Sequence, residues 1–377
     1  MKDRGKAEYF HGREKELSAF KELVEKAEKE KSGTIFLVQG APGVGKSAFL
    51  EHCKGMINPK KWDVAEGDPD IFWNVKQMRR ALRLGGQIRI FKAFAQLGIE
   101  KLIKFGAEFR WADKTIIGSV NARKKKGLLL VVDEVQDLGR KAAPPDKVSE
   151  TMVRNVLNTM HNWKINKPFI LLVGGLGMSK SVFKEYGISR FNDNCAFNLE
   201  KLDEKSERNI LWDWIVKKEG VNKNNRKIGH WINEITNHTL GWPQHVTSYA
   251  NVLSRYLKEH KGDLSEKGLK HVLTLGKAKR TNYYHGRIEE LEGEERELIA
   301  QLLKEQKSRF SKNDIVFFFQ NKLDSNESKN LFDRALGKGV FHQNQDGFFN
   351  VPVPSMKNWL LSEYGSVGNG NLHGGSR

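Results

Sequence analysis

The sequence has few cysteines and no long apolar run. Its 377 residues include two cysteines, Cys53 and Cys195, too few for the disulfide framework of a small secreted domain. No stretch approaches the run of about 18 apolar residues that indicates a membrane-spanning helix. The charged N-terminus MKDRGKAEYF does not have the pattern of a signal peptide. These absences predict a cytoplasmic protein of a reducing compartment, with no membrane partner.

The length and composition predict a folded chain of two or three units. A single hydrophobic core stops growing well below 377 residues. With 38% hydrophobic and 29% charged residues, the chain is neither wholly disordered nor collagen-like. Its net charge of +18 is the kind of excess that attracts phosphate polyanions or acidic surfaces.

More than half of the net positive charge lies in residues 54–126, which contain 17 basic and seven acidic residues. Aromatic residues alternate with the basic ones, so this predicted basic insert could neutralise backbone phosphates and stack on exposed bases. Alternatively, the aromatic residues pack the core and the lysines are only solvated. The region 286–364 has a net charge of −2, which is unlike a DNA-reading module.

Three short apolar runs predict buried parallel strands, at residues 34–39, 128–132 and 169–173. An amphipathic helix over 13–30 precedes the first strand, and a helix over 147–163 separates the second from the third. This order is the βαβ rhythm of a three-layer α/β fold. The first predicted domain, 1–199, is therefore an α/β core with a parallel sheet.

Helices replace strands after residue 200. Helical periodicity predicts a domain with four helices, near residues 204–219, 225–238, 243–260 and 264–275. A basic linker, 277–287, follows, so the second domain covers 200–285. Three short helices and a hairpin around Asp346-Gly347 predict a winged helix over 286–364. Residues 365–377 are rich in glycine, serine and asparagine and predict a disordered tail.

A phosphate-binding pattern follows the first predicted strand and precedes a helix. It has the full G-x4-G-K-[ST] spacing, in Gly40-Ala41-Pro42-Gly43-Val44-Gly45-Lys46-Ser47, with Ala48 adjoining. Such a loop turns its backbone N–H groups and a helix N-terminus toward a phosphate. Lys46 is predicted to bridge the β- and γ-phosphates of ATP, and Ser47 to ligate Mg²⁺. The alternative is a glycine-rich turn that arose by chance.

Two acidic residues, Asp133 and Glu134, end the second predicted strand. An apolar strand ending in acid is where a parallel sheet delivers the second carboxylate of a Mg²⁺-nucleotide site. Asp133 is the candidate for holding Mg²⁺ through water, and Glu134 is the candidate for polarising the attacking water. The alternative is an ordinary acidic pair at the end of a strand.

These motifs resemble the AAA+/STAND division of P-loop ATPases, and most closely origin-recognition-type ATPases and bacterial ATPases with a DEAQ-like box. The resemblance is carried by the two motifs, by the box from Asp133 to Gln136, and by the opening Phe10-His11-Gly12-Arg13-Glu14. In that division the opening segment lines the adenine pocket, which implies that Tyr9, Phe10 and Gly12 lie near the base.

Two weaker features also resemble this division. Gly241-Trp242-Pro243 is similar to the element by which the lid of such ATPases approaches the nucleotide. This resemblance implies that the helical domain, 200–285, is the lid and that Pro243 contacts the nucleotide. A helix start with proline in its first turn is the alternative. Arg190 stands where such proteins have an arginine finger that reaches into a neighbour's site, which implies a homo-oligomer; its alternative is a solvated arginine. The third strand ends in Gly174-Gly175, without the usual polar sensor residue, and no arginine follows Gly241.

Two functions of different classes follow from the sequence. The first is an oligomeric ATPase that acts as a nucleotide-controlled switch on DNA, in transposition, replication or anti-phage defence, with DNA held by the basic insert and the lid. The second is a signalling or scaffold ATPase whose output is binding to another protein, through the predicted winged helix. Both use ATP and Mg²⁺.

Overall fold

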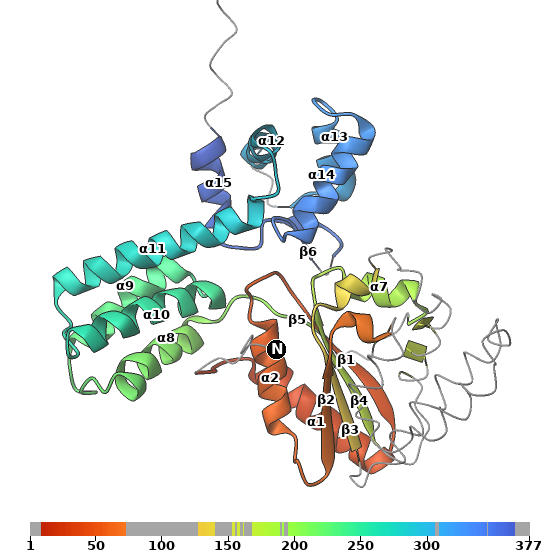
Figure 1. Cartoon of the computed structure of the whole chain (residues 1–377), viewed down its shortest axis with the longest axis horizontal. Coiled ribbons are helices and arrows are strands. Elements are labelled where there is room, and N and C mark those ends of the chain that lie inside the picture. The colour runs from red at the N-terminus through yellow and green to blue at the C-terminus, as the bar shows by residue number, and fades with distance from the viewer. Residues whose placement is uncertain are drawn as a thin grey trace, which may run out of the picture. The chain divides into compact units, whose positions relative to one another are not determined.

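A computed structural model of the chain divides into two compact units (Figure 1). The first unit comprises Met1–Ala7, Arg13–Gln39 and Lys46–Leu199, and the second comprises Glu8–Gly12, Gly40–Gly45 and Glu200–Arg377. The structure describes residues 9–72, 127–139, 153–154, 157–158, 161, 168–188, 191, 195–305, 309–344 and 346–365. Arg190, most of the predicted basic insert (73–126), most of the predicted helix at 147–163 and most of the predicted tail (366–377) lie outside these residues.

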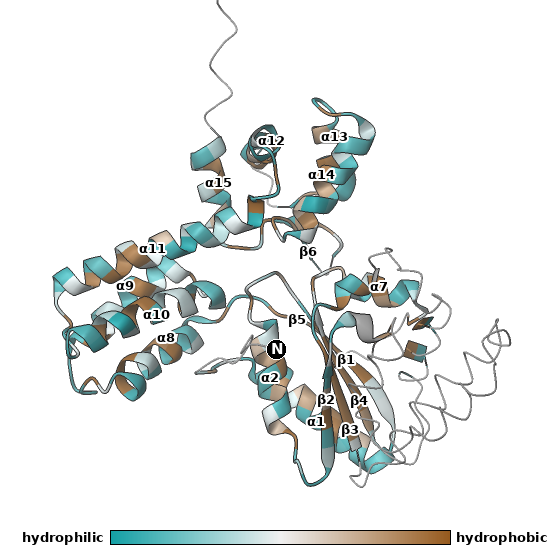
Figure 2. Ribbon diagram, viewed as in Figure 1, coloured by the Kyte–Doolittle hydropathy of each residue, from teal (hydrophilic) through white to brown (hydrophobic). Residues whose placement is uncertain are grey.

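A five-stranded parallel sheet forms the centre of the first unit, in the order β2-β3-β4-β1-β5. The three predicted strands are confirmed as β1 (Gly33–Gln39), β3 (Gly127–Val132) and β4 (Phe169–Gly175). Residues at their centres are fully buried, as the apolar runs require. Two edge strands were not predicted: β2 (Trp62–Gly67) and β5 (Ala196–Asn198). Figure 2 shows the central strands as the most hydrophobic part of this unit.

Helices cover both faces of the sheet, which confirms the three-layer fold. Alternate side chains of a strand point to opposite faces. Phe36 packs edge-on against Phe20 of α1 (Glu14–Glu30) at 5.4 Å between ring centroids. Ile35 and Leu37 belong instead to a buried cluster that includes Val182 and Phe183 of α7 (Ser179–Glu185). The helix α2 (Lys46–Met56) lies on the α1 side and contacts β4.

The predicted basic insert does not begin at residue 54. Residues up to Met56 complete α2, and β2 then pairs with β3 as part of the core sheet. A short 3-10 helix, η1 (Pro69–Phe72), follows. Sequence reasoning missed β2 because only Trp62 and Ala65 of this edge strand are buried, so it has neither an apolar run nor a regular alternation.

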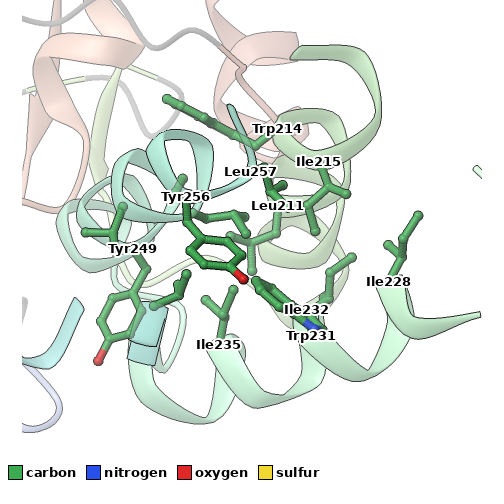
Figure 3. Packing of buried hydrophobic residues seen from close by; sticks show 14 of the residues in the cluster. Leu211, Trp214, Ile215, Ile228, Trp231, Ile232, Ile235, Tyr249, Tyr256 and Leu257 are labelled. Atoms are coloured by element: carbon green, nitrogen blue, oxygen red, sulfur yellow. The ribbon is translucent and has the colours of Figure 1, made fainter. Parts of the chain in front are cut away.

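The second unit contains four helices after residue 200, near the predicted positions. They are α8 (Glu204–Asp213), α9 (Lys227–Thr239), α10 (Pro243–Glu259) and α11 (Glu266–Ile288), and a π-helical turn, η4 (Trp214–Lys218), extends α8. Figure 3 shows the core between them, where the ring centroids of Trp231 and Tyr256 lie 5.9 Å apart. Asp203 and Ser265 cap α8 and α11 through their side-chain oxygens.

The predicted linker at 277–287 is wrong, because these residues continue α11 as one helix of 23 residues. The interval contains no proline and no turn sequence that would end a helix. Directly before it, α11 approaches α10 so closely that a Cβ on Gly276 would lie 2.4 Å from the Tyr249 ring. Close packing against α10 therefore supports a helix where charge alone indicated a linker.

The helices and the hairpin predicted after residue 286 are present. They are α12 (Gly293–Lys304), α13 (Lys312–Phe319), α14 (Ser325–Gly337) and the antiparallel pair β6 (His342–Gln343) and β7 (Phe349–Asn350), followed by α15 (Met356–Tyr364). Capping boxes begin the first three of these helices. Within the described residues, none of the helices is long and apolar enough to cross a membrane.

A buried carboxyl group holds the start of α10 in place. Glu207 of α8 is 3% exposed and accepts a hydrogen bond from the fully buried Thr239 hydroxyl. Burial raises the pKa of Glu207, and hydrogen bonds from Thr239 and the Gly241 backbone oppose part of that rise. Glu207 thus connects α8 to the turn that precedes Trp242 and Pro243.

The substitution Glu207→Gln should weaken the pH dependence of stability. The pKa of Glu207 is higher in the folded protein than in the unfolded chain. Its stabilising contribution to the free energy of unfolding is therefore complete below the unfolded pKa, and it disappears as the pH rises through the folded pKa. Glutamine keeps an acceptor but does not ionise. Urea unfolding monitored by tryptophan fluorescence between about pH 4 and 8 should give a flatter profile for Glu207→Gln. The exposed Glu204→Gln is the control, and equal slopes in all three proteins would contradict this role.

Candidate functional site

The predicted phosphate loop connects β1 to α2, in the strand–loop–helix order that its function requires. β1 ends at Gln39, and α2 begins at Lys46. Lys46 is 6% exposed and occupies the first turn of the helix, and Ser47 and Ala48 follow it. Backbone N–H groups at a helix N-terminus have no partner within the helix and attract anions. The loop residues 40–45 group with the second unit.

Gly43 allows the loop its tight conformation. Its φ of +83° lies in the left-handed region, which L-residues with a side chain rarely adopt. A Cβ atom at this position would lie 2.7 Å from the Tyr283 hydroxyl and 3.0 Å from Trp242 Nε1. Both the backbone angle and the close approach of these two side chains therefore require glycine here.

Ser47 and Asp133, both of the first unit, are in direct contact. The Ser47 hydroxyl donates to Asp133 Oδ2 at 2.5 Å, and the Glu134 N–H donates to Asp133 Oδ1 at 2.9 Å. The hydroxyl of the loop helix and the carboxylate after β3 thus converge, although 86 residues separate them. These are the two predicted Mg²⁺-binding side chains, and the structure brings them together.

Gly174, near the end of β4, provides the space for this contact. In the parallel register Val132 lies opposite Val173, so Asp133 lies beside Gly174. A Cβ on Gly174 would lie 2.5 Å from Asp133 Oδ1, and one on Gly175 would lie 2.0 Å from Ser179 Oγ. A sensor side chain is absent from these two positions because neighbouring polar groups occupy that space.

Glu134 has an unusual backbone and a defined partner. Its φ is +56°, which is uncommon for a residue other than glycine and is often found at functional sites. Gln136 Nε2 donates to Glu134 Oε2 at 2.5 Å, while Gln136 Oε1 accepts from the Leu176 N–H at 3.0 Å. Gln136 therefore fixes the carboxylate relative to the end of β4. The sequence placed Gln136 in the acidic box but did not predict this positioning role.

Residues of the lid helices contact the phosphate loop, and most of them were not predicted. Pro243 was predicted, and it packs about 3.6 Å from the position of a Cβ on Gly45. The Gln244 N–H donates to the Gly43 carbonyl at 3.1 Å, and the Tyr283 hydroxyl donates to the Pro42 carbonyl at 2.8 Å. No motif indicates the last two contacts, because they depend on how α10 and α11 pack.

The opening segment packs against the first lid helices. The Tyr9 ring lies edge-on to Trp214 at 6.2 Å, and a Cβ on Gly12 would approach Ser206 Oγ at 2.7 Å. His11 Nε2 lies 2.8 Å from Asp213 Oδ2. Burial tends to raise the pKa of Asp213, but Lys217 and His11 more than offset it, so the pKa is lowered. The predicted adenine contacts Tyr9, Phe10 and Gly12 therefore lie at the lid.

The chemistry of the site fits a Mg²⁺-nucleotide. Mg²⁺ is usually held by one or two protein oxygens, with the remaining positions filled by water and phosphate. A serine hydroxyl against one carboxylate matches this small donor set. Glu134 follows Asp133 in the sequence, and its carboxylate accepts a hydrogen bond from the Gln136 side-chain amide and is exposed to solvent. A base that acts on water needs both a fixed position and access to water. Arg190, the predicted finger, lies outside the described residues.

Comparison with known proteins identifies the fold. The Walker-type ATPase PABY2304 of Pyrococcus abyssi superposes with a TM-score of 0.52 at 14% identity, covering 94% of this chain and 97% of that one. The ORC2 protein of Aeropyrum pernix, in ADPNP and ADP complexes, superposes with a TM-score of 0.56 at 11% identity, covering 96% and 98%. No protein-family model and no curated protein match the sequence. The chain therefore shares the fold of these two proteins.

The substitution Gly174→Ala should displace Asp133. The added methyl would lie within 2.5 Å of Oδ1 and 2.9 Å of Leu50 Cδ1, an overpacking that costs about 1–3 kcal/mol of stability. We expect a lower Tm and at least a tenfold loss of Mg²⁺-dependent nucleotide binding. Gly55→Ala is the control because nothing lies within 4 Å of its Cβ in α2; it should keep binding and stability. Normal binding by Gly174→Ala would show that Asp133 does not depend on this space.

Proposed function

We propose that the protein is a Mg²⁺-dependent ATPase of the AAA+/STAND type, which acts as a nucleotide-controlled oligomeric switch on DNA. The observation that carries the proposal is the contact between Ser47 and Asp133. A chance glycine-rich turn would give no reason for a buried parallel strand to deliver a carboxylate to that one hydroxyl. The fold shared with a Walker-type ATPase adds support.

Each residue of the site has a distinct task in this proposal. The loop N–H groups from Gly40 to Ser47, together with Lys46, bind the triphosphate and offset the charge that develops on it. Ser47 and Asp133 hold Mg²⁺, which neutralises phosphate charge when bound. Glu134 orients and polarises the attacking water, and Gln136 keeps its carboxylate in position.

Hydrolysis would reset the arrangement of the protein rather than transform a small molecule. Phe10 and Gly12 of the opening segment and Pro243 of the lid belong to the second unit, as do loop residues 40–45. Nucleotide contacts from these residues would make lid position depend on ATP. In the oligomer, Arg190 would act as a finger for a neighbouring subunit, and the three helices and hairpin after residue 290 would form a winged helix.

DNA is the proposed polyanionic partner because the lid presents an extended basic surface. From Lys267 to Arg287, α11 carries six lysine and arginine residues and no acidic one. Lys267, Lys270, Lys277 and Lys279 are exposed. The helix is about 34 Å long, at 1.5 Å per residue over 23 residues, and spans several phosphates of a duplex. A groove of about 660 Å³ lined by residues of α9 and α11 includes two of these lysines.

The alternative function, binding to another protein without DNA, is favoured by one observation. Phe317 of α13 is 71% exposed, beside the half-buried Phe318. An exposed phenylalanine on a helix of a nearly neutral module is more typical of a protein contact than of a DNA-reading surface. The two functions differ in their response to salt and DNA, which makes them separable.

The roles of Lys46 and Glu134 can be separated by one pair of variants. Lys46→Ala should abolish nucleotide binding, because the loop loses its charge on the phosphates. Glu134→Gln should bind ATP as the wild type does but lose at least a hundredfold in kcat, because glutamine cannot act as a base. Equilibrium binding of a fluorescent ATP analogue and phosphate release would measure these effects. Unchanged ATPase activity in Lys46→Ala would overturn the site, and loss of binding in Glu134→Gln would argue against its role as the base.

DNA binding should weaken steeply with salt and depend on α11. Replacing Lys270, Lys277 and Lys279 by Gln should reduce the slope of log Kd against log salt by about 2 to 3, roughly 0.9 for each phosphate that is no longer neutralised. The control replaces Lys205, Lys322 and Lys329, which are exposed elsewhere in the second unit, and should leave the slope nearly unchanged. A wild-type protein that shows no salt-dependent DNA binding would favour the protein-binding alternative.

A further inference from the structure

Three successive carbonyl groups of the phosphate loop are engaged by hydrogen-bond donors. The Ala41 carbonyl accepts from the Val44 N–H within the loop, at 3.3 Å. The Pro42 carbonyl accepts from the Tyr283 hydroxyl of α11 at 2.8 Å. The Gly43 carbonyl accepts from the Gln244 N–H, in the first turn of α10, at 3.1 Å. Two of these three donors belong to the lid.

The direction of these carbonyls matters for binding an anion. A phosphate is bound by backbone N–H groups, and a carbonyl oxygen that turned toward it would repel it. A flexible glycine-rich loop samples both orientations, and fixing one of them reduces the entropic cost of binding the phosphate. Donors that hold the carbonyls therefore prepare the loop for a phosphate before it arrives.

Tyr283 is itself held in place. The Arg287 guanidinium lies over its ring, 4.8 Å from the centroid, and Arg287 Nη1 donates to the Lys338 carbonyl at 3.4 Å. Burial raises the pKa of the Tyr283 hydroxyl, which Arg287 partly opposes, so the hydroxyl keeps its proton and remains a donor at neutral pH. The ring and the hydroxyl are thus positioned by α11 and by the residues after α14.

The turn after α14 supports the same part of the loop. Gly339 has a φ of +71°, and a Cβ on it would lie 2.2 Å from Pro42 Cγ. Both Tyr283 and the turn at Gly339 therefore contact Pro42.

From this geometry we propose that Tyr283 is a positioning residue for the phosphate loop, which holds the Pro42 carbonyl outward and makes nucleotide affinity depend on the docking of α11. Gln244 has the same role for Gly43 through its backbone. The inference rests on the proposed nucleotide site and adds a lid-based control of its affinity. Because coupling between binding events is reciprocal, a nucleotide should in turn stabilise α11 against the loop.

A single hydroxyl group tests the proposal. Tyr283→Phe removes the donor and keeps the ring under Arg287. A net hydrogen bond corresponds to a two- to tenfold change in affinity, so we expect Kd for ATP to rise by about that factor while kcat changes less than twofold. Hydrogen exchange at the amides of residues 43–47 should also become faster without nucleotide, since the loop is less ordered.

Tyr284→Phe is the matched control. It removes the hydroxyl of the next residue of the same helix, which bonds to Ser355 Oγ and not to the loop. Its Kd and its loop exchange should equal those of the wild type. Exchange measured with ATP should slow across residues 280–288 in the wild type and in Tyr284→Phe, and less so in Tyr283→Phe.

The outcomes distinguish this inference from the proposed function. If the wild type binds ATP and the two phenylalanine variants have the same Kd and the same loop exchange, the positioning role of Tyr283 is overturned and the nucleotide site stands. If the wild type does not bind ATP, the proposed function fails, and this inference fails with it. A rise in Kd and faster loop exchange in Tyr283→Phe alone supports the proposal.

Discussion

The candidate site depends on the parallel pairing of β1, β4 and β3. Pairing in this order places the residues that follow each strand along one edge of the sheet. Asp133 reaches Ser47 because β4, which separates their strands, has a glycine at position 174 that leaves room for the carboxylate. The rule that ligands bind at the carboxyl ends of parallel strands here takes a specific form, in which the middle strand contributes space and the outer two contribute the polar groups.

The sequence predicted those parts of the molecule that depend on local pattern. The runs that became β1, β3 and β4 are mainly apolar because both of their faces are covered, and the helices of the lid have clear periodicity. The spacing from Gly40 to Ser47 identified the loop, and the acidic pair identified its partner. For these elements, the local sequence pattern and the three-dimensional structure favour the same kinds of residue at each position.

The remaining features depend on contacts that no local pattern encodes. β2 and β5 lie at the edges of the sheet, where few residues are fully buried and the sequence pattern is therefore weak. The interval 277–287 indicated a linker by charge, yet α11 packs closely against α10 at Gly276 and continues through the interval. No motif identifies the roles of Tyr283 and Gln136. Tyr283 acts on Pro42, which is distant in the sequence. Gln136 acts through a side-chain amide whose direction only the structure gives.

The continuity of α11 also limits which insertions and deletions this chain can accept during evolution. Successive residues of a helix are rotated by about 100°, so a single insertion between Gly276, which packs against α10, and Tyr283 would rotate the tyrosine away from Pro42. A flexible linker of the same length would absorb such an insertion without effect. The number of residues between Gly276 and Tyr283 is therefore fixed, because it sets the direction in which the tyrosine side chain points. Relatives that keep this contact should vary in the composition of the segment, and not in its length.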